Sequence, residues 1–161
     1  MLDPTMLMTD VHIVPYTPGY RTAFRDLNLE WIGTYFEVEP EDRKQLDDPE
    51  THVLQPGGAI LMAVDGNEPV GTGALIRTGP HEFELAKMAV TPRAQGRGVG
   101  RRVCAALIEL ARKKGAHRLE LLSHRSLAPA ISLYRSLGFQ EIPLGDVPYR
   151  RANIRMELPL R

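Results

Sequence analysis

The chain of 161 residues contains one cysteine, few aromatic residues and no net charge. Its single cysteine, Cys104, excludes an internal disulfide and fits a reducing compartment. No run of about eighteen apolar residues occurs, so a membrane-spanning helix is not expected. The first residues, M-L-D-P-T-M, lack the basic-then-apolar order of a signal peptide. We therefore expect a cytoplasmic protein without a membrane partner.

Composition and length are those of a globular protein. Hydrophobic residues make up 43% and charged residues 25% of the chain. The length suits one domain, which we expect over residues 1–161 with a core from about residue 10 to 158. Charge is uneven, because residues 1–60 carry a net −7 and residues 61–161 a net +7. The acidic half either steers a cationic ligand or is a solvated loop, and for E-V-E-P-E-D and D-D-P-E we favour the loop.

Metal and nucleic-acid sites find no support in the sequence. The five histidines are scattered without metal-ligand spacing, and His81-Glu82 is not completed to H-E-x-x-H, so we expect no metal. The basic residues cluster near one glycine-rich turn without interleaved aromatic residues, so we expect no nucleic-acid partner. Cys104 falls beside apolar positions of a predicted helix, which favours a buried filler over a nucleophile.

The most informative segment is Glu84 to Gly100, E-L-A-K-M-A-V-T-P-R-A-Q-G-R-G-V-G. Glycines at 96, 98 and 100 leave backbone N–H groups uncovered before a helix predicted from about Gly98 to Lys114. Arg93, Arg97, Arg101 and Arg102 add positive charge, so the turn predicts a phosphate-binding cradle. A P-loop is excluded because no Lys-Ser/Thr follows. A dinucleotide fold fits poorly, because arginines occupy the place of the third small residue and some ninety residues come first.

The remaining pattern predicts alternating strands and helices. Strands are expected at 11–16, 59–64, 70–77, 82–90, 118–123, 139–143 and 151–158, and helices at 18–36 (one or two), 41–46, 98–114 and 127–137. Strands 59–64 and 70–77 form a hairpin, and strand 82–90 pairs antiparallel with 70–77. The single helix before strand 118–123 makes that strand parallel to 82–90. Gly71 and Gly73 indicate a bulge or a close backbone approach.

Two motifs resemble the GNAT acetyltransferase superfamily. Gln95-Gly-Arg-Gly98-Val-Gly100 is similar to the family's Q/R-x-x-G-x-G/A pyrophosphate signature, and Leu127-A-P-A-I-S-L-Tyr134-R-S-L-Gly138-Phe139 resembles its A-x-x-L-Y-x-x-x-G-F helix. The resemblance implies a GNAT-type α/β fold, with a mixed, mostly antiparallel central sheet, one parallel splayed strand pair and helices on both faces. Leu127 stands where many relatives carry Asn, so one polar contact to the cofactor is absent or is supplied by Ser126.

The resemblance also implies an activity, N-acetyl transfer from acetyl-CoA to an amine acceptor by direct transfer in a ternary complex. A non-catalytic module that senses acyl-CoA is the alternative. The main chain of Met88, Ala89 and Val90 would bind the pantetheine arm. The pyrophosphate would be held by Gln95, Gly96, Arg97, Gly98, Val99, Gly100 and Arg101. A homodimer is compatible, because dimers are common in the family.

Catalytic candidates follow from the same resemblance. Glu84 is the candidate general base, with the alternation of the strand placing it on the side of Ala86 and Met88; Glu82 and an ordered water are the alternatives. Tyr134 is the candidate general acid, and the alternative is an aromatic that fills space. Trp31, Tyr35 and Phe36 either contact the acceptor or are core, and their helical spacing favours core.

Overall fold

The computed structural model describes residues 10–160, which contain one sheet of seven strands in the order β1-β2-β3-β4-β5-β7-β6. In chain order the elements are β1 (Val11–Pro15), η2 (Pro18–Tyr20), α2 (Arg21–Tyr35), α3 (Pro40–Asp47), η3 (Glu50–Leu54), β2 (Ala59–Asp65), β3 (Glu68–Gly79), β4 (Glu82–Val90), η4 (Pro92–Ala94), α4 (Val99–Lys113), β5 (Arg118–Ser123), α5 (Ala128–Ser136), β6 (Gln140–Ile142) and β7 (Ile154–Pro159).

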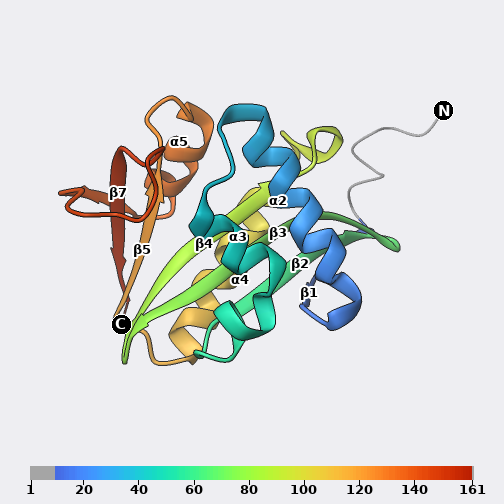
Figure 1. Ribbon diagram of the computed structural model, residues 1–161, viewed down its shortest axis with the longest axis horizontal. Coiled ribbons are helices and arrows are strands. Elements are labelled where there is room, and N and C mark those ends of the chain that lie inside the picture. Colours follow the sequence, from blue (N-terminus) through green and yellow to red (C-terminus); the bar gives the residue numbers. More distant parts are fainter. Residues whose placement is uncertain (1–9, 161) are drawn as a thin grey trace.

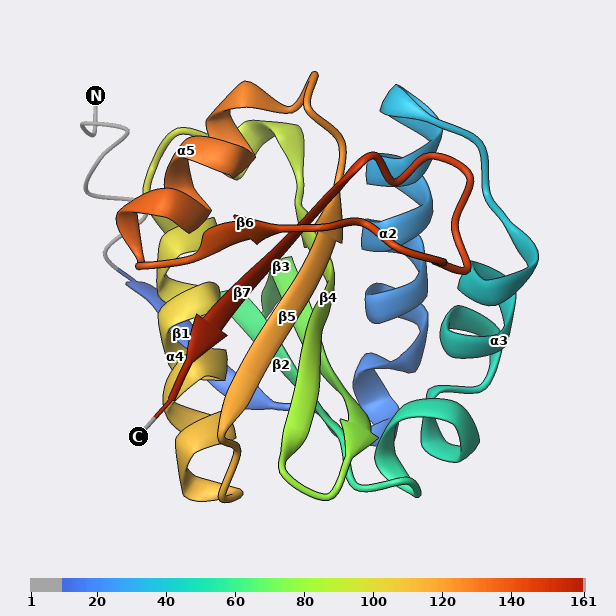
Figure 2. The ribbon, with the colours of Figure 1, turned by 90° about the vertical axis from the view of Figure 1, so that its left-hand side faces the viewer.

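The arrangement confirms the predicted fold class (Figure 1). Neighbouring strands are antiparallel except β4 and β5, which pair in parallel across the α4 crossover. Figure 2 shows α4 and α5 on one side of the sheet and α2 and α3 on the other. The predicted closing strands are shorter than expected, since β6 ends at Ile142 and β7 begins only at Ile154.

Each face of the sheet has its own core. On the α4 side, Val103 and Leu107 pack with Leu75 and Leu121. On the α2 side, Phe24 belongs to a second cluster, completed by Ile32, Leu46, Val53 and Met62. Fully burying one such side chain contributes about 1.5–3 kcal/mol, so the two cores hold the sheet between its helices.

Helix α4 lies very close to the sheet at Gly73. A Cβ atom on Gly73 would lie 2.7 Å from Leu107 Cδ1 and 2.5 Å from Met88 Sδ. The β3–β4 register also shifts between Thr72 and Ala74. The two alternatives that the sequence left open at this glycine, a bulge and a close approach, are therefore both present.

The bulge in β4 corrects one expectation about side-chain direction. Lys87 has a φ of 54°, in the left-handed region that residues other than glycine rarely adopt. Glu84 pairs with Ile76, which packs on the α2 side, whereas Met88 packs on the α4 side. Strict alternation had placed Glu84 and Met88 on the same face; the extra residue at the bulge reverses the direction after Ala86.

The acidic segment before β2 is the second correction. We expected E-V-E-P-E-D to be a solvated loop, but Asp42 is fully buried and lies on α3. Glu39 caps that helix in a capping box with Asp42, and Pro40 occupies its first turn. The short helix itself was predicted. Asp42 is buried because it forms ion pairs with residues far away in the sequence, which the local sequence does not reveal.

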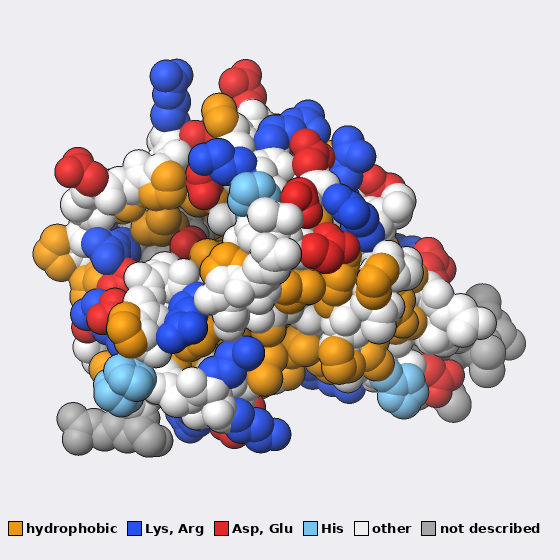
Figure 3. Space-filling model, turned by 60° about the horizontal axis from the view of Figure 1, so that its bottom comes forward, with side chains coloured by type: hydrophobic (Ala, Val, Ile, Leu, Met, Phe, Trp, Pro, Cys, Tyr) orange, Lys and Arg blue, Asp and Glu red, His pale blue; other side chains and the backbone are white. Residues whose placement is uncertain are grey.

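The surface mixes charge and hydrophobic area. On the face drawn in Figure 3, side chains of both charge signs lie next to one another in the upper part, hydrophobic side chains gather in the middle, and Lys and Arg are prominent along the lower margin. None of the helices in the described part of the chain has the length and apolar character needed to cross a bilayer.

Candidate active site

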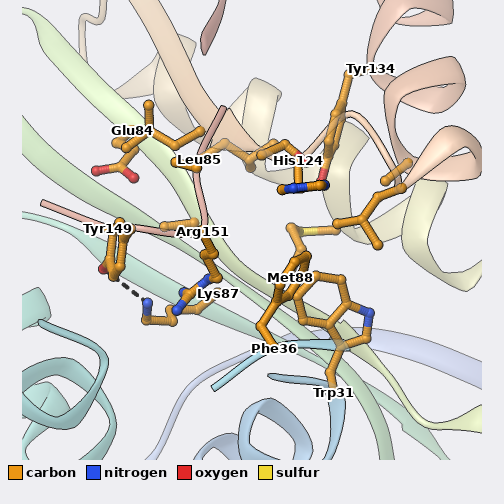
Figure 4. Close-up of a pocket in the computed structure, with 16 residues that line it drawn as sticks. Trp31, Phe36, Glu84, Leu85, Lys87, Met88, His124, Tyr134, Tyr149 and Arg151 are labelled. Atoms are coloured by element: carbon orange, nitrogen blue, oxygen red, sulfur yellow. Dashed lines mark hydrogen bonds between the residues drawn. The ribbon is translucent and has the colours of Figure 1, made fainter. Parts of the chain in front are cut away.

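A cavity opens where β4 and β5 separate. The two strands pair from Glu82 and Arg118 only as far as Leu85 and Leu121, although both continue beyond these residues. β5 then pairs with β7 on its other side. The gap forms part of an open cavity, whose lining is drawn in Figure 4. The parallel pair therefore splays as the family resemblance implied.

Glu84 lines this cavity from β4. Within residues 10–160 no side chain hydrogen-bonds to its carboxylate, and burial, aided by the negative charge of Glu120 and Glu41 and opposed by Lys87, raises its pKa to about 7. The alternative base, Glu82, lies outside the lining and pairs with Arg118 at 2.9 Å. The structure therefore brings Glu84, and not Glu82, to the cavity.

Tyr134 enters the cavity from α5, opposite the strands (Figure 4). Its ring packs edge-to-face with Phe139, with centroids 6.0 Å apart. Burial raises its pKa, so the phenol stays protonated at neutral pH. Leu127 also lines the cavity, while the Ser126 hydroxyl lies 2.6 Å from Nδ1 of His124. Ser126 thus contacts a histidine, His124, that itself lines the cavity.

A buried cluster of charges forms the other side of the cavity. Lys87 Nζ donates to Asp42 Oδ1 at 2.7 Å and to the Tyr149 hydroxyl at 3.0 Å. Arg151 donates to both carboxylate oxygens of Asp42, at 2.6 and 2.7 Å, and to Glu39 at 3.2 Å. Lys87 and Arg151 both also lie over the Tyr149 ring. We call Glu39, Asp42, Lys87, Tyr149 and Arg151 the ion cluster.

The pKa values of Asp42 and Lys87 in the ion cluster are both lowered, for different reasons. Burial alone would raise the pKa of Asp42, but hydrogen bonds from Arg151 and the charge of Lys87 lower it to about 2. Burial lowers the pKa of Lys87, and Asp42 opposes this. Lys87 Nζ lies 2.7 Å from the Asp42 carboxylate, which accepts three further hydrogen bonds. This geometry is typical of an ion pair between a charged lysine and a charged aspartate. The cluster ties α3 to the bulge of β4 and to the chain before β7.

Aromatic rings form a wall on the α2 side. Trp31 and Phe36 line the cavity, with ring centroids 6.3 Å apart, and the Phe36 ring lies 5.3 Å from that of His124. Tyr35 is outside the lining and 48% exposed, and its ring packs on Trp31 at 5.3 Å. Trp31 and Phe36 thus face the cavity, whereas Tyr35 lies behind them and contacts both rings.

The glycine turn has the predicted conformation. Gly96 and Gly98 have φ values of 75° and 80°, and Gly98 is the N-cap of α4. The first bond of the helix ladder runs from Arg102 N to Gly98 O, so the N–H groups of the first helical turn have no partner within the helix. A Cβ on Gly96 or Gly98 would meet no atom within 4 Å. The space in front of these amides suits an anion.

Several side chains that were predicted to surround the phosphate cradle contact other parts of the fold. The Gln95 amide donates to Val90 O at 3.0 Å and so braces the end of β4. Arg101 contacts the Ser136 hydroxyl on α5 at 2.8 Å. Arg93 instead pairs with Glu68, at 2.8 Å, and with Asp65 in the β2–β3 turn. The positive charge at the cradle therefore comes from fewer arginines than the sequence indicated.

Cys104 takes no part in the cavity, and residues 10–160 show no metal-binding cluster. Cys104 is buried, and burial raises its pKa to about 12, which is the behaviour of a core residue. Among the described residues no group of three His, Cys, Asp or Glu side chains is placed to hold a metal ion.

Our sequence analysis missed the ion cluster and His124. One signal was available: Lys87 interrupts an otherwise apolar strand end, A-K-M-A-V, and a buried lysine requires a counter-ion. Its partners Asp42 and Tyr149 lie 45 and 62 positions away in the sequence, so the pattern could not identify them.

A family model described as "Acetyltransferase (GNAT) family" matches residues 22–139. The N-alpha-acetyltransferase RimI of Mycobacterium tuberculosis is 35% identical over 108 residues, which cover 66% of this chain and 63% of RimI. The chain therefore spans less than two thirds of that relative's length.

Solved structures show the same fold. An acetyltransferase of the GNAT family from Staphylococcus aureus superposes with a TM-score of 0.85 at 22% identity, covering 94% of this chain and 99% of that one. The yncA protein of Salmonella typhimurium, solved with its cofactor acetyl-CoA, superposes with a TM-score of 0.76 at 22% identity, covering 94% of each chain.

Proposed function

Because the chain belongs to the GNAT acetyltransferase family, whose members use acetyl-CoA as cosubstrate, we propose that it transfers an acetyl group from acetyl-CoA to a primary amine. Transfer is direct, within a ternary complex. The observation that carries this proposal is the early end of β4–β5 pairing, which opens a cavity lined by a carboxylate with a raised pKa and by a half-buried phenol.

The glycine turn and the end of β4 are the proposed cofactor site. Free N–H groups at the start of α4 hold the pyrophosphate, with Gln95, Gly96, Arg97, Gly98, Val99, Gly100 and Arg101 around it. The main chain of Met88, Ala89 and Val90 faces the splay and binds the pantetheine arm. A main-chain N–H near Met88 then donates to the thioester oxygen as it gains negative charge, a contribution of roughly 3 kcal/mol.

Glu84 is the proposed general base. An alkyl ammonium has a pKa near 10.4, so a proton must leave the acceptor before its nitrogen attacks. A carboxylate with a pKa of about 7 is a stronger base than an ordinary glutamate and is still largely ionised just above neutral pH. Glu84 accepts the proton directly or through one water.

Tyr134 assists departure of the thiolate. The free thiol has a pKa of about 8.5, and burial raises the pKa of Tyr134 above its usual 10. Complete proton transfer from the phenol is therefore uphill. Tyr134 instead stabilises the thiolate by donating a hydrogen bond to it. The second proton, which the nitrogen loses after it has attacked, neutralises the thiolate, and the first proton leaves Glu84 for solvent.

A screen of amines for release of free coenzyme A thiol tests the proposal. Tyr134→Phe keeps the ring and removes the donor, so an enzyme loses turnover while it retains acetyl-CoA affinity. The alternative, a non-catalytic module that senses acyl-CoA, binds acetyl-CoA without turnover in both proteins.

A further inference from the structure

The cations in the cavity lining are already neutralised. Lys87 is held by Asp42, and Arg151 by Asp42 and Glu39. By contrast, the carboxylate of Glu84 has no ion-pair partner within 4.0 Å in the described part of the chain. In its ionised form Glu84 is therefore the lining group available to pair with an ammonium group, and it repels a carboxylate.

The cavity also presents flat apolar surface. Trp31 and Phe36 lie on the α2 side, and the His124 ring continues the wall at 5.3 Å from Phe36. Figure 4 shows these rings facing the same space as Met88. A planar hydrophobic group stacks on such rings, and a cation beside them gains from the ring quadrupoles.

The chain between β6 and β7 closes one side of the cavity. The Glu39 carboxylate accepts hydrogen bonds from Arg150 N at 2.7 Å and Arg151 N at 3.3 Å. Figure 2 shows this segment reaching across to the start of α3. The residues from 149 to 151 and from 39 to 42 are thus joined beside the cavity and limit it on this side.

From these three features we propose, as a deepening of the proposed function, that the acceptor is a small primary arylalkylamine without a carboxylate. Its ammonium group lies at Glu84 and its ring against Trp31 and Phe36. A free amino acid with the same ring binds roughly 100-fold more weakly, because its carboxylate lies beside Glu84 while Lys87 and Arg151 are already paired with Asp42 and Glu39.

Three ligands with one ring system test the inference: tryptamine, tryptophan and tryptophanamide, the last with the bulk of tryptophan but no carboxylate. Each is titrated into the protein saturated with coenzyme A, which permits no turnover. We expect tryptamine and tryptophanamide to bind about 100-fold more tightly than tryptophan. Equal or tighter binding of tryptophan overturns the inference, as does tighter binding of a tetrapeptide that begins with tryptophan.

Two variants locate the binding. Trp31→Ala should weaken tryptamine binding about tenfold or more, whereas Trp31→Phe retains a ring and most of the affinity. Glu84→Gln should reduce the preference for tryptamine over tryptophan, because the repelling charge is gone. An unchanged preference in Glu84→Gln contradicts the placement of the ammonium group.

These titrations separate the two proposals. If coenzyme A does not bind, the proposed function fails, and titrating the free protein still tests the acceptor class. If coenzyme A and tryptamine both bind but no acetyl group is transferred, the enzymatic proposal fails while the ligand class is supported.

Discussion

Replacing Asp42 with asparagine tests whether the ion cluster holds the acceptor side of the fold together. The change keeps the shape of the side chain and removes its charge. The pKa of Asp42 falls from 3.8 to about 2 in the folded protein. Since one pKa unit corresponds to about 1.36 kcal/mol, this linkage is worth about 2 kcal/mol. Leaving the buried Lys87 without its counter-ion raises the cost toward about 3–5 kcal/mol.

Urea unfolding measured by circular dichroism provides the assay. We expect Asp42→Asn to lose about 3 kcal/mol at pH 7, and the double variant with Lys87→Met to recover part of that loss, because the unpaired ammonium is removed. Glu41→Gln is the control: Glu41 makes a partly exposed contact to Lys44 at 3.4 Å, worth less than about 0.5 kcal/mol.

The pH dependence follows from the direction of the shift. A carboxyl group with a lowered pKa in the folded state stabilises the protein above its unfolded pKa, and the contribution disappears as pH falls through the folded value. The difference between wild type and Asp42→Asn should therefore shrink between about pH 4 and pH 2. A loss below about 1 kcal/mol at pH 7, or a difference that stays constant down to pH 2, would refute the reasoning.

Three further predictions concern the site. Tyr134→Phe should lower kcat by about 100-fold or more while the Kd of acetyl-CoA, measured by calorimetry, changes less than about threefold; an equal loss of cofactor binding would show that the ring packing had failed. Glu84→Gln should abolish the rise of kcat/KM with pH centred near pH 7, which deprotonation of Glu84 causes in the wild type; a persisting limb would assign it to another group. Gly98→Ala should weaken coenzyme A binding and cost about 1 kcal/mol, because its φ of 80° strains any side chain, whereas Gly33→Ala, in the interior of α2 with open space for a methyl group, should be neutral or stabilising.

The sequence predicted the elements whose signals are local. The residue pattern predicted β4, the closely spaced glycines predicted the turn before α4, and one intervening helix predicted the parallel pairing with β5. These elements place the splay, and with it the cavity and Glu84. For this reason the glycine turn and the parallel strand pair beside the cavity could be predicted from the sequence.

The acceptor side could not be predicted, because its determinants are long-range. Asp42 looks solvated in its acidic segment and becomes buried only through Lys87 and Arg151. The left-handed φ of Lys87 has no local signature, since glycine would be the expected residue there. Without that bulge, alternation assigned Met88 to the wrong face. The segment before β7 was predicted to be strand from Arg151, but that arginine turns inward to the ion cluster.

The most direct test of the central claim is mass spectrometry of an amine incubated with acetyl-CoA and the protein, with free coenzyme A thiol measured in parallel. We predict that the amine gains one acetyl group for each thiol released, and that no acetyl group remains on the protein. Acetyl-CoA that binds tightly and is returned intact with every amine in the panel would contradict the account.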